Sequence, residues 1–569
     1  SFTALGGTSL QAIALAASGQ RQLAKDVSVA RLISPLPLAG ALAQARDFVD
    51  TAPAPGARAA GPAIRDLLPG QRAMLAAHLA GRDQSYHLMF TVRPPAPLSL
   101  DQTRAALRRL TTRHQSLRTM FGQATPVAQR IVLAPAHPPR LLHQALPSGV
   151  DAVRAVHELY SRQAPQLLLP FEQPPVVFVH SRAGDETLVT VLVHHVLIDG
   201  WGIGVLWREF AALCAGGSDH LDTDGPLPEW IGTRLAAQQS SGALSSAMER
   251  VGNRLDRAPL VASLPTDLAR GDEADGAGGR LVFTLPPRLA EDTDRLARRC
   301  RSTVTSVLLA AWALTVTRRL GVDDVVLGVA ASGRPEAGME DLIGLCTRII
   351  PVRCRTDDGL RIDAYLRATA GALADALADA DLPFAQVVAG LAGQVDGDRN
   401  PVAQIGFAAH HELVPDAIDS TDGPWIVHEG HCNGSTLDAL LFVQAWSPAP
   451  RLAVEYATSA QTAADAGELA ESLQAVLREL ADHPDATLGE VSGLSPAQRR
   501  RLSDLGAGGR FDTDDDLWSR FERHADRRPD AVAVVDVHAD VTLTYGELRA
   551  HALAQAYLLS ERGVRASDR

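Results

Sequence analysis

The sequence predicts an α/β protein with more than one domain. At 569 residues the chain is too long for a single core, and its 46% hydrophobic and 21% charged residues can supply several. The apolar, β-branched run 188–193 is typical of a buried strand, and the apolar residues between 203 and 214 have helical spacing. Further along, a helical stripe at 304–320 precedes an apolar strand at 323–329. Strands and helices are therefore mixed along the chain.

Breaks in composition indicate how the chain is divided. Residues 50–62 are rich in Pro, Ala and Gly, which is typical of a linker, and residues 506–516 combine Gly and Asp as flexible joints do. The polar, Gly-rich stretch 252–279 indicates a crossover between two lobes of one domain. We therefore predict an N-terminal segment at 1–48, a linker at 49–63, a large domain at 64–495 with lobes at about 64–250 and 251–495, a linker at 496–516, and a C-terminal segment at 517–569.

Charge and cysteine content restrict the class of protein. A net charge of −12 argues against nucleic acid as a partner, because phosphate binding needs clustered cations. The five cysteines are scattered and never spaced as CxxC, so we expect neither a disulfide framework nor structural zinc. The chain contains no run of 18 apolar residues and no signal peptide, which argues against membrane insertion and secretion. We expect a cytoplasmic protein and, since the first residue is not Met, a piece of a longer one.

Two adjacent histidines mark a candidate active site. His194 and His195 end the predicted strand 188–193, and Asp199 and Gly200 stand at the turn into the following helix. Such a turn can present a polar side chain to a cleft, and Asp199 can also cap the helix. Adjacent strand residues point to opposite faces, so a metal site built from His194, His195 and Asp199 is not favoured.

The pattern HHxxxDG, followed by Trp201, resembles the active-site motif of nonribosomal peptide synthetase condensation domains. Further motifs of that family follow in register over some 430 residues: Gln71–Met74, Arg113–Phe121 (RHxxLRTxF), Gly333-Arg334-Pro335, Ile343-Gly344, Leu382–Phe384, Arg399–Pro401 and Asp438. One departure is Thr347-Arg348, where the family has Asn-Thr.

The resemblance implies a fold and a set of site residues. The fold would be a V-shaped pseudodimer of two chloramphenicol-acetyltransferase-like lobes, with the catalytic histidine in a tunnel between them. His195 would face the tunnel and accept a proton or hydrogen bond from the attacking amine, whereas His194 would pack structurally. Asp199 would form a buried ion pair with an arginine, for which Arg118 or Arg113 is the candidate. Gly200 would relieve crowding where the backbone lines the tunnel. A second pair, His410-His411, is interpreted as a loop feature near Arg399–Pro401.

Both ends of the chain resemble neighbouring synthetase domains. Leu5–Leu10 (LGGTSL) resembles the motif of peptidyl carrier domains, in which the serine, here Ser9, carries 4'-phosphopantetheine; a helix N-cap is the simpler reading of the same serine. The family's first carrier helix would precede Ser1, so 1–48 would be a partial helical bundle. Leu543–Leu548 resembles the first core motif of adenylation domains, so 517–569 would be the start of one.

The implied function is amide-bond formation between a donor thioester on an upstream carrier and the amine of a downstream aminoacyl-carrier thioester. The partners would be those two carriers and a phosphopantetheinyl transferase. An epimerase shares HHxxxDG, but the order of domains argues against it, while heterocyclisation requires Asp in place of His194. An inactive docking module and an acyltransferase that uses free CoA remain alternatives, the first because of Thr347-Arg348.

Overall fold

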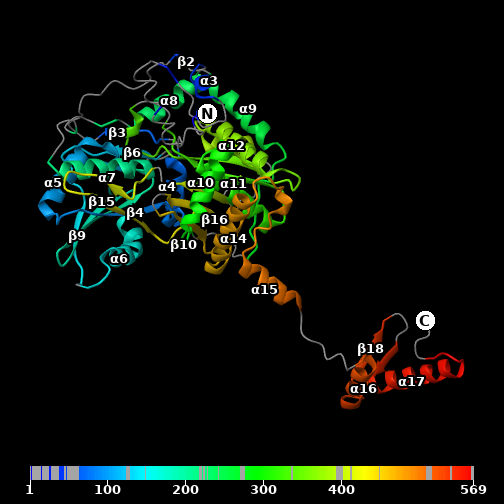
Figure 1. Ribbon diagram of the computed structural model, residues 1–569. Coiled ribbons are helices and arrows are strands. Elements are labelled where there is room, and N and C mark those ends of the chain that lie inside the picture. Colours follow the sequence, from blue (N-terminus) through cyan, green and yellow to red (C-terminus); the bar gives the residue numbers. More distant parts are fainter. Residues whose placement is uncertain are drawn as a thin grey trace. The chain divides into compact units, whose positions relative to one another are not determined.

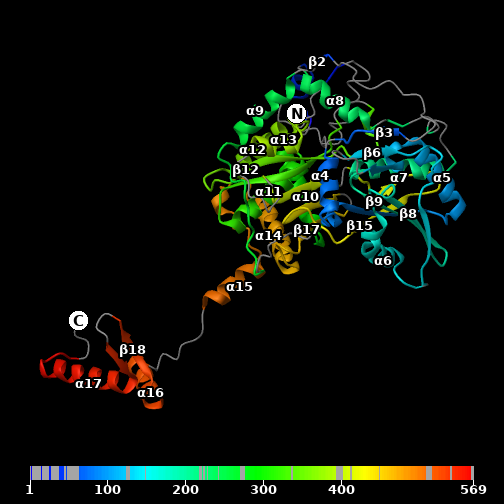
Figure 2. The ribbon, with the colours of Figure 1, turned by 180° about the vertical axis from the view of Figure 1, so that it is seen from behind.

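The computed structural model describes residues 63–565 apart from 69, 123–127, 148, 217–220, 222–224, 227, 241, 269–275, 335–337, 392–401, 411–412, 447–448, 508–515 and 538–540. Before residue 63 it describes Phe2, Leu15, 25–26, Leu32, 37–43 and 46–47. The chain separates into two compact units, Ser1–Ser495 and Pro496–Arg569. The first unit holds two mixed six-stranded sheets, visible side by side in Figures 1 and 2.

The first sheet carries the histidine pair. Its strands, in spatial order, are β14 (Ala417–Ile418), β15 (Trp425–His431), β4 (His87–Arg93), β9 (Glu186–His194), β8 (Val176–Ala183) and β7 (Leu141–Ala145). All neighbours are antiparallel except β7 and β8. The predicted strand 188–193 thus lies within β9, which has a hydrogen-bonded neighbouring strand along each edge.

Alternation along the central strands separates two apolar cores. Val177 and Leu192 lie in a cluster with helix α6 (Ala152–Leu167), whereas Phe178 and Val191 lie in a cluster with helices α5 (Leu100–Arg113) and α7 (Gly200–Cys214). Because successive strand residues face opposite sides, each strand contributes to both cores. The result is a helix–sheet–helix sandwich that holds the end of β9 between layers.

Four helices pack together on one face of the second sheet. Its spatial order is β10 (Gly278–Thr284), β17 (Arg451–Ala457), β16 (Ala439–Ala445), β13 (Ile405–Ala409), β11 (Asp324–Ala331) and β12 (Arg348–Arg355). Helices α10 (Pro287–Arg299), α11 (Val304–Leu320), α12 (Ile362–Ala378) and α14 (Ala463–Asp482) pack on it around the largest apolar cluster. Helix α11 coincides with the predicted helix 304–320, and Trp312 in it is fully buried, donating from Nε1 to the Gly406 carbonyl oxygen at 2.8 Å.

The range 251–495 contributes one segment to the first sheet. Strands β14 and β15 belong by sequence to the range 251–495, yet β15 pairs with β4, for example His428 with Thr91, and completes the first sheet. Residues after 250 therefore contribute to both sheets.

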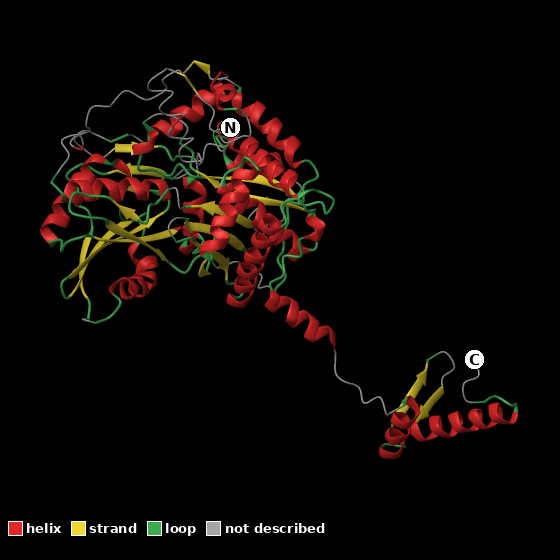
Figure 3. Cartoon of the chain, viewed as in Figure 1, coloured by secondary structure: helices red, strands yellow, loops and turns green. Residues whose placement is uncertain are grey.

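Smaller elements complete the described parts (Figure 3). In the first unit they are β1 (Lys25–Asp26), α3 (Leu38–Ala43), β2 (Arg46–Asp47), β3 (Ala63–Arg65), α4 (Gln71–Leu79), β5 (Thr119–Gly122), β6 (Gln129–Val132), α8 (Glu229–Ser240), α9 (Ala243–Leu255) and α13 (Phe384–Gly390), with the short 3-10 turns η2 (Gln84–Tyr86), η3 (Gln115–Arg118), η5 (Met339–Asp341) and η6 (Leu488–Glu490). The second unit contains α15 (Pro496–Ala507), α16 (Leu517–Arg527), the hairpin β18 (Val532–Asp536) and β19 (Val541–Thr544), and α17 (Tyr545–Glu561).

Within the described residues, no single helix is long and apolar enough to cross a bilayer. Helices α10 and α11 pass that test only as a pair, and the pair is bent by 105°.

Candidate active site

The histidine pair sits where β9 gives way to helix α7. The backbone N–H of His195 donates to the Tyr86 carbonyl oxygen at 2.7 Å, and that of Leu197 donates to the His194 carbonyl oxygen at 3.0 Å, which closes a tight turn. Asp199 then begins α7, accepting the Gly202 N–H on Oδ1 at 2.9 Å. The capping role predicted for Asp199 is thus confirmed.

The two imidazoles have different surroundings. His194 is fully buried, and its Nδ1 accepts the Val196 backbone N–H at 3.1 Å. A neutral ring bound in this way carries its proton on Nε2. His195 is only partly buried, and its enclosed Nδ1 has no hydrogen-bond partner among the described residues. Of the pair, His195 is therefore the imidazole that can meet a substrate.

Burial sets the charge state of His195. Desolvation lowers the pKa of this imidazole, although the negative charge of Asp199 and nearby backbone carbonyls act in the opposite direction. The net effect is a neutral ring near pH 7. A neutral imidazole can accept a proton, which is the role expected of His195.

A carboxylate that the sequence did not reveal stands behind His194. Oδ2 of Asp83 lies 3.6 Å from Nε2 of His194, 2.5 Å from Nδ1 of His78 and 3.3 Å from Nε2 of His87. Burial alone would raise the pKa of Asp83, but its contacts with the three imidazoles hold it well below its usual range. Asp83 is therefore an anion that faces the inner histidine.

This group contains enough ligand atoms for a metal ion, since atoms of His78, Asp83 and His194 all lie within 4.8 Å of one another. The hydrogen bond from Val196 argues against one, because it leaves the proton of His194 on the nitrogen that would have to bind the metal. The cluster is better described as a carboxylate held by imidazole N–H groups. His78, Asp83 and His87 are close in sequence, but only the register pairing of His87 with His194 brings the motif histidine to them.

The partner of Asp199 differs from the prediction. Nη1 and Nη2 of Arg334 each donate to one carboxylate oxygen of Asp199 at 2.8 Å, and both side chains are 0% exposed. Oδ2 also accepts the backbone N–H groups of Cys346 and Thr347 at 2.8 and 2.9 Å. Burial alone would raise the pKa of Asp199, but the positive charge of Arg334 and the hydrogen bonds from Arg334, Gly202 and Cys346 together lower it.

The assignment of Arg118 or Arg113 as the partner of Asp199 is therefore wrong. Nε of Arg113 lies 3.2 Å from Oε2 of Glu209, a residue of α7 that is well separated from Asp199 along the helix. Arg118 donates to the Leu133 carbonyl oxygen. Both arginines belong to the α5 side of the first sheet. The true partner lies in the motif Gly333-Arg334-Pro335, where an arginine in a family motif was a usable signal.

The atypical pair Thr347-Arg348 has a structural role at this site. Oγ1 of Thr347 donates to Oδ2 of Asp199 at 3.2 Å, in addition to its backbone N–H. Arg348 points elsewhere and contacts Oδ1 of Asp381 at 3.4 Å. The departure from the family pattern thus adds a donor to the Asp199 carboxylate.

Gly200 is not the crowded glycine of helix α7. A Cβ at Gly200 would meet Nε2 of His410 at 3.7 Å, which is ordinary contact, whereas at Gly204 it would lie 2.4 Å from the Leu413 carbonyl oxygen. The prediction that Gly200 relieves crowding is wrong for this packing. The same distance places His410 beside the motif, while His411 and Arg399–Pro401 lie outside the described residues.

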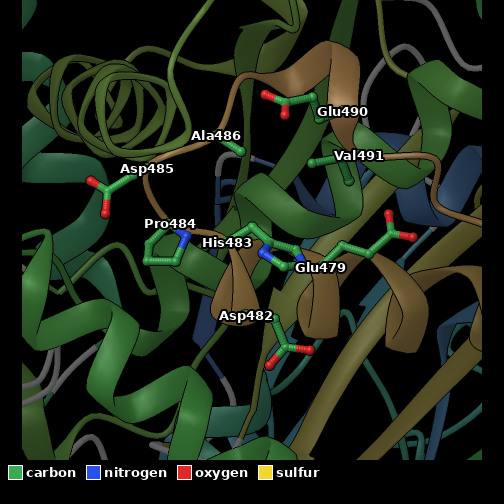
Figure 4. Close-up of a pocket in the computed structure, with 8 residues that line it drawn as sticks. All are labelled: Glu479, Asp482, His483, Pro484, Asp485, Ala486, Glu490 and Val491. Atoms are coloured by element: carbon green, nitrogen blue, oxygen red, sulfur yellow. The ribbon is translucent and has the colours of Figure 1, made fainter.

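A separate pocket opens at the end of α14, lined by Glu479, Asp482, His483, Pro484, Asp485, Ala486, Glu490 and Val491 (Figure 4). It shares no residue with the motif. Asp485 is already paired with Arg299 and Arg361, and Glu490 accepts the Thr487 N–H as a cap. These two carboxylates thus have structural partners.

The fold and the site together define a class of protein, an α/β enzyme built on two sheets. At the end of one strand the imidazole of His195 is neutral and partly exposed. The nearby carboxylate of Asp199 is held in an ion pair. The sequence model of the Condensation domain family matches residues 64–503, and the chain belongs to that family. It is a condensation domain of the nonribosomal peptide synthetase type, an enzyme of the transferase class. In such synthetases, condensation domains work with carrier domains.

Similar proteins include N-(5-amino-5-carboxypentanoyl)-L-cysteinyl-D-valine synthase of Amycolatopsis lactamdurans, 29% identical over 97% of this chain, and the phosphinothricin tripeptide synthetase PhsC of Streptomyces viridochromogenes, 28% identical over 84%. The chain spans 15% and 45% of their lengths.

Two solved structures share the fold. A four-domain nonribosomal peptide synthetase, crystallised with AMP and glycine, has a TM-score of 0.71 at 20% identity, with 89% of this chain and 40% of that one covered. The first condensation domain of the CDA synthetase has a TM-score of 0.67 at 21% identity, with 76% and 99% covered.

Proposed function

We propose that this condensation domain joins a donor aminoacyl or peptidyl thioester, carried on phosphopantetheine, to the amine of a downstream aminoacyl-carrier thioester. One observation supports this most strongly. Of the two motif histidines, only His195 is partly exposed, and its ring is neutral. His194 and Asp199 are held by neighbouring groups.

The chemistry asks little of the protein beyond alignment. The amine nitrogen attacks the thioester carbonyl carbon, the C–S bond breaks, and the amine proton passes by way of His195 to the departing thiolate. An α-amine with a pKa of about 7.7–8.0 is partly neutral near pH 7.5, so a strong base is not required. Alignment of two tethered reactants supplies about 7–11 kcal/mol, whereas general-base assistance is worth about 10²–10⁴-fold. Positioning therefore contributes the larger share.

The finer assignments belong to this proposal as well. Residues 64–495 would form the two-lobed pseudodimer, 1–48 the partial carrier domain and 517–569 the start of an adenylation domain, with linkers at 49–63 and 496–516. Ser9, which lies outside the described residues, would carry 4'-phosphopantetheine after attachment by a phosphopantetheinyl transferase in the cytoplasm; no step above depends on it.

Product formation tests the proposal. A donor aminoacyl-pantetheine thioester and an aminoacyl thioester on an intact carrier are mixed with wild type and with His195→Ala, and products are identified by mass spectrometry. We expect a dipeptidyl product that falls sharply in the variant, whose melting temperature serves as the folding control. Deuterium exchange at Cα without product would instead indicate an epimerase. Carrier binding without either reaction would indicate a docking module.

A further inference from the structure

His410 is placed beside the motif by its own strand. It follows β13, and its backbone N–H donates to the Val443 carbonyl oxygen at 2.9 Å. Its ring meets Phe442 edge-on at 4.8 Å between centroids and keeps 19% of its side chain exposed. The Nε2 edge points at Gly200, 3.7 Å from where a Cβ on that residue would lie. A second imidazole thus lies beside Gly200, the first residue of α7, which follows His195 by five residues.

The other ring nitrogen of His410 faces a buried carboxylate. Nδ1 lies 3.9 Å from Oε2 of Glu429 on β15, and it has no hydrogen-bond partner among the described residues. Glu429 in turn pairs with Nη1 of Arg280 on β10 at 2.5 Å, and Arg280 also contacts Glu455 at 2.8 Å. The Nδ1 side of the His410 ring thus faces the negative end of an ion-paired carboxylate.

Two carboxylates share one arginine in this group. Arg280 supplies one positive charge against the two carboxylates of Glu429 and Glu455, whose side chains are 13% and 8% exposed. Burial alone would raise the pKa values of both acids, but the charge of Arg280 and the contacts with Arg280, His410 and His431 together hold these values below their usual range. His410 lies beside Glu429 and His431 lies 3.3 Å from Glu455, so each carboxylate has one imidazole neighbour in addition to Arg280.

We propose that His410 is a second functional imidazole of the condensation site: the Glu429 carboxylate faces the Nδ1 side of the ring, and the Nε2–H of the ring donates a hydrogen bond to the thioester carbonyl oxygen as that oxygen gains negative charge. No bond is made or broken at His410. His195 remains the group that moves the amine proton. Donors aimed at a developing oxyanion in a site shielded from water are among the largest contributions to catalysis. The inference rests on the condensation activity proposed above.

The test compares two histidines of the same charge network. His410→Leu removes the proposed donor, and His431→Leu is the matched control, since His431 is 18% exposed, contacts Glu455 and lies 3.0 Å from the Gly434 carbonyl oxygen. His410→Gln retains an N–H donor. Dipeptide formation gives kcat and KM for each variant, and thermal melting reports folding. If His410→Leu does not fold, His410→Phe preserves a ring against Phe442 and replaces it.

We expect His410→Leu to lower kcat by about 10²–10³-fold with little change in KM, since a lost oxyanion donor has this effect. His410→Gln should recover much of that loss, and His431→Leu should remain near wild type. Unchanged kcat in a folded His410→Leu variant, or equal losses in the two leucine variants, would overturn the inference while the condensation activity stands. Absence of product from the wild type would instead refute the proposed function.

Discussion

Asp199 and Arg334 form a bidentate ion pair from which solvent is excluded, with both Nη–O distances at 2.8 Å. Arg334 also donates to the Leu342 carbonyl oxygen at 3.1 Å. The pair joins the start of helix α7, close to His195, to the segment between β11 and β12. The aspartate of the motif is thus a structural anchor between the two sheets.

Removal of one partner of this pair should impair folding. Asp199→Asn is expected to lower the free energy of unfolding by about 3–5 kcal/mol, because a buried guanidinium loses its counter-charge. The double variant Asp199→Asn, Arg334→Met should lose less than the sum of the single variants, as measured by chemical denaturation. Asp101→Asn, which breaks an exposed pair with Arg104, is the control, with less than about 1 kcal/mol expected. A stable Asp199→Asn variant without turnover would contradict the structural assignment.

The lowered pKa of His195 predicts where the imidazole contributes to turnover. The ring is neutral at pH values above its pKa, which burial places below the ordinary value of about 6.5. The ratio of wild-type to His195→Ala turnover should therefore be constant above pH 6.5 and decline at lower pH as the ring becomes protonated. The ratio separates this effect from protonation of the substrate amine, which affects both proteins equally. A ratio that already declines between pH 8 and 7 would contradict the assignment.

Substitution by alanine should affect two glycines of helix α7 in different ways. One variant should lose stability, and the other should lose turnover. Gly204→Ala places a methyl group against the Leu413 carbonyl oxygen and should destabilise the protein by about 1–3 kcal/mol. Gly200→Ala makes only ordinary contacts, so its melting temperature should stay near that of the wild type while the added methyl narrows the space beside His410 and reduces turnover. Melting curves and product assays on both variants check this, and severe unfolding of Gly200→Ala would restore the crowding interpretation.

Buried histidines should make folding stability depend on pH below neutrality. Burial lowers the pKa of His157 to about 4, so between pH 6.5 and 4 the unfolded chain binds a proton that the folded chain does not. The contribution of His157 is therefore fully favourable above pH 6.5 and decreases as the pH falls. His157→Gln should reduce the slope of unfolding free energy over this interval by up to about 1.4 kcal/mol per pH unit. An identical slope in both proteins would show that His157 is not the titrating group.

Zinc should not stabilise the protein through Asp83. Because the Val196 N–H occupies Nδ1 of His194, binding of a metal at Nε2 would require loss of that hydrogen bond or of a second proton. Added Zn²⁺ should leave the melting temperature of the wild type unchanged, and it should likewise leave that of Asp83→Asn unchanged. A stabilisation by zinc that the substitution abolishes would establish a metal site instead.

The sequence predicted those features that depend on neighbours along the chain. The strand before His194, the cap at Asp199 and the helix 304–320 all follow from local periodicity and capping chemistry. It failed where contacts depend on long-range packing. The partner of Asp199 lies 135 residues away, and the approach of Asp83 to His194 depends on the register of β4 against β9.

For one of these contacts, the ion pair of Asp199, the motifs alone made Arg334 a possible partner. Arg334 belongs to a family motif, as Arg113 and Arg118 do. By contrast, Asp83 had no motif to support it, and its proximity to His194 arises from the pairing of β4 with β9.

The exchange of β15 into the first sheet has a consequence for biosynthesis. Strand β4 gains its second neighbour only when residues 425–431 have left the ribosome, more than 300 residues after β4 itself. Until then, the growing polypeptide presents an unpaired apolar edge, a known template for misassociation. Truncations that stop before residue 425 should accumulate in inclusion bodies, and chaperones that shield strand edges should matter most during this interval of translation.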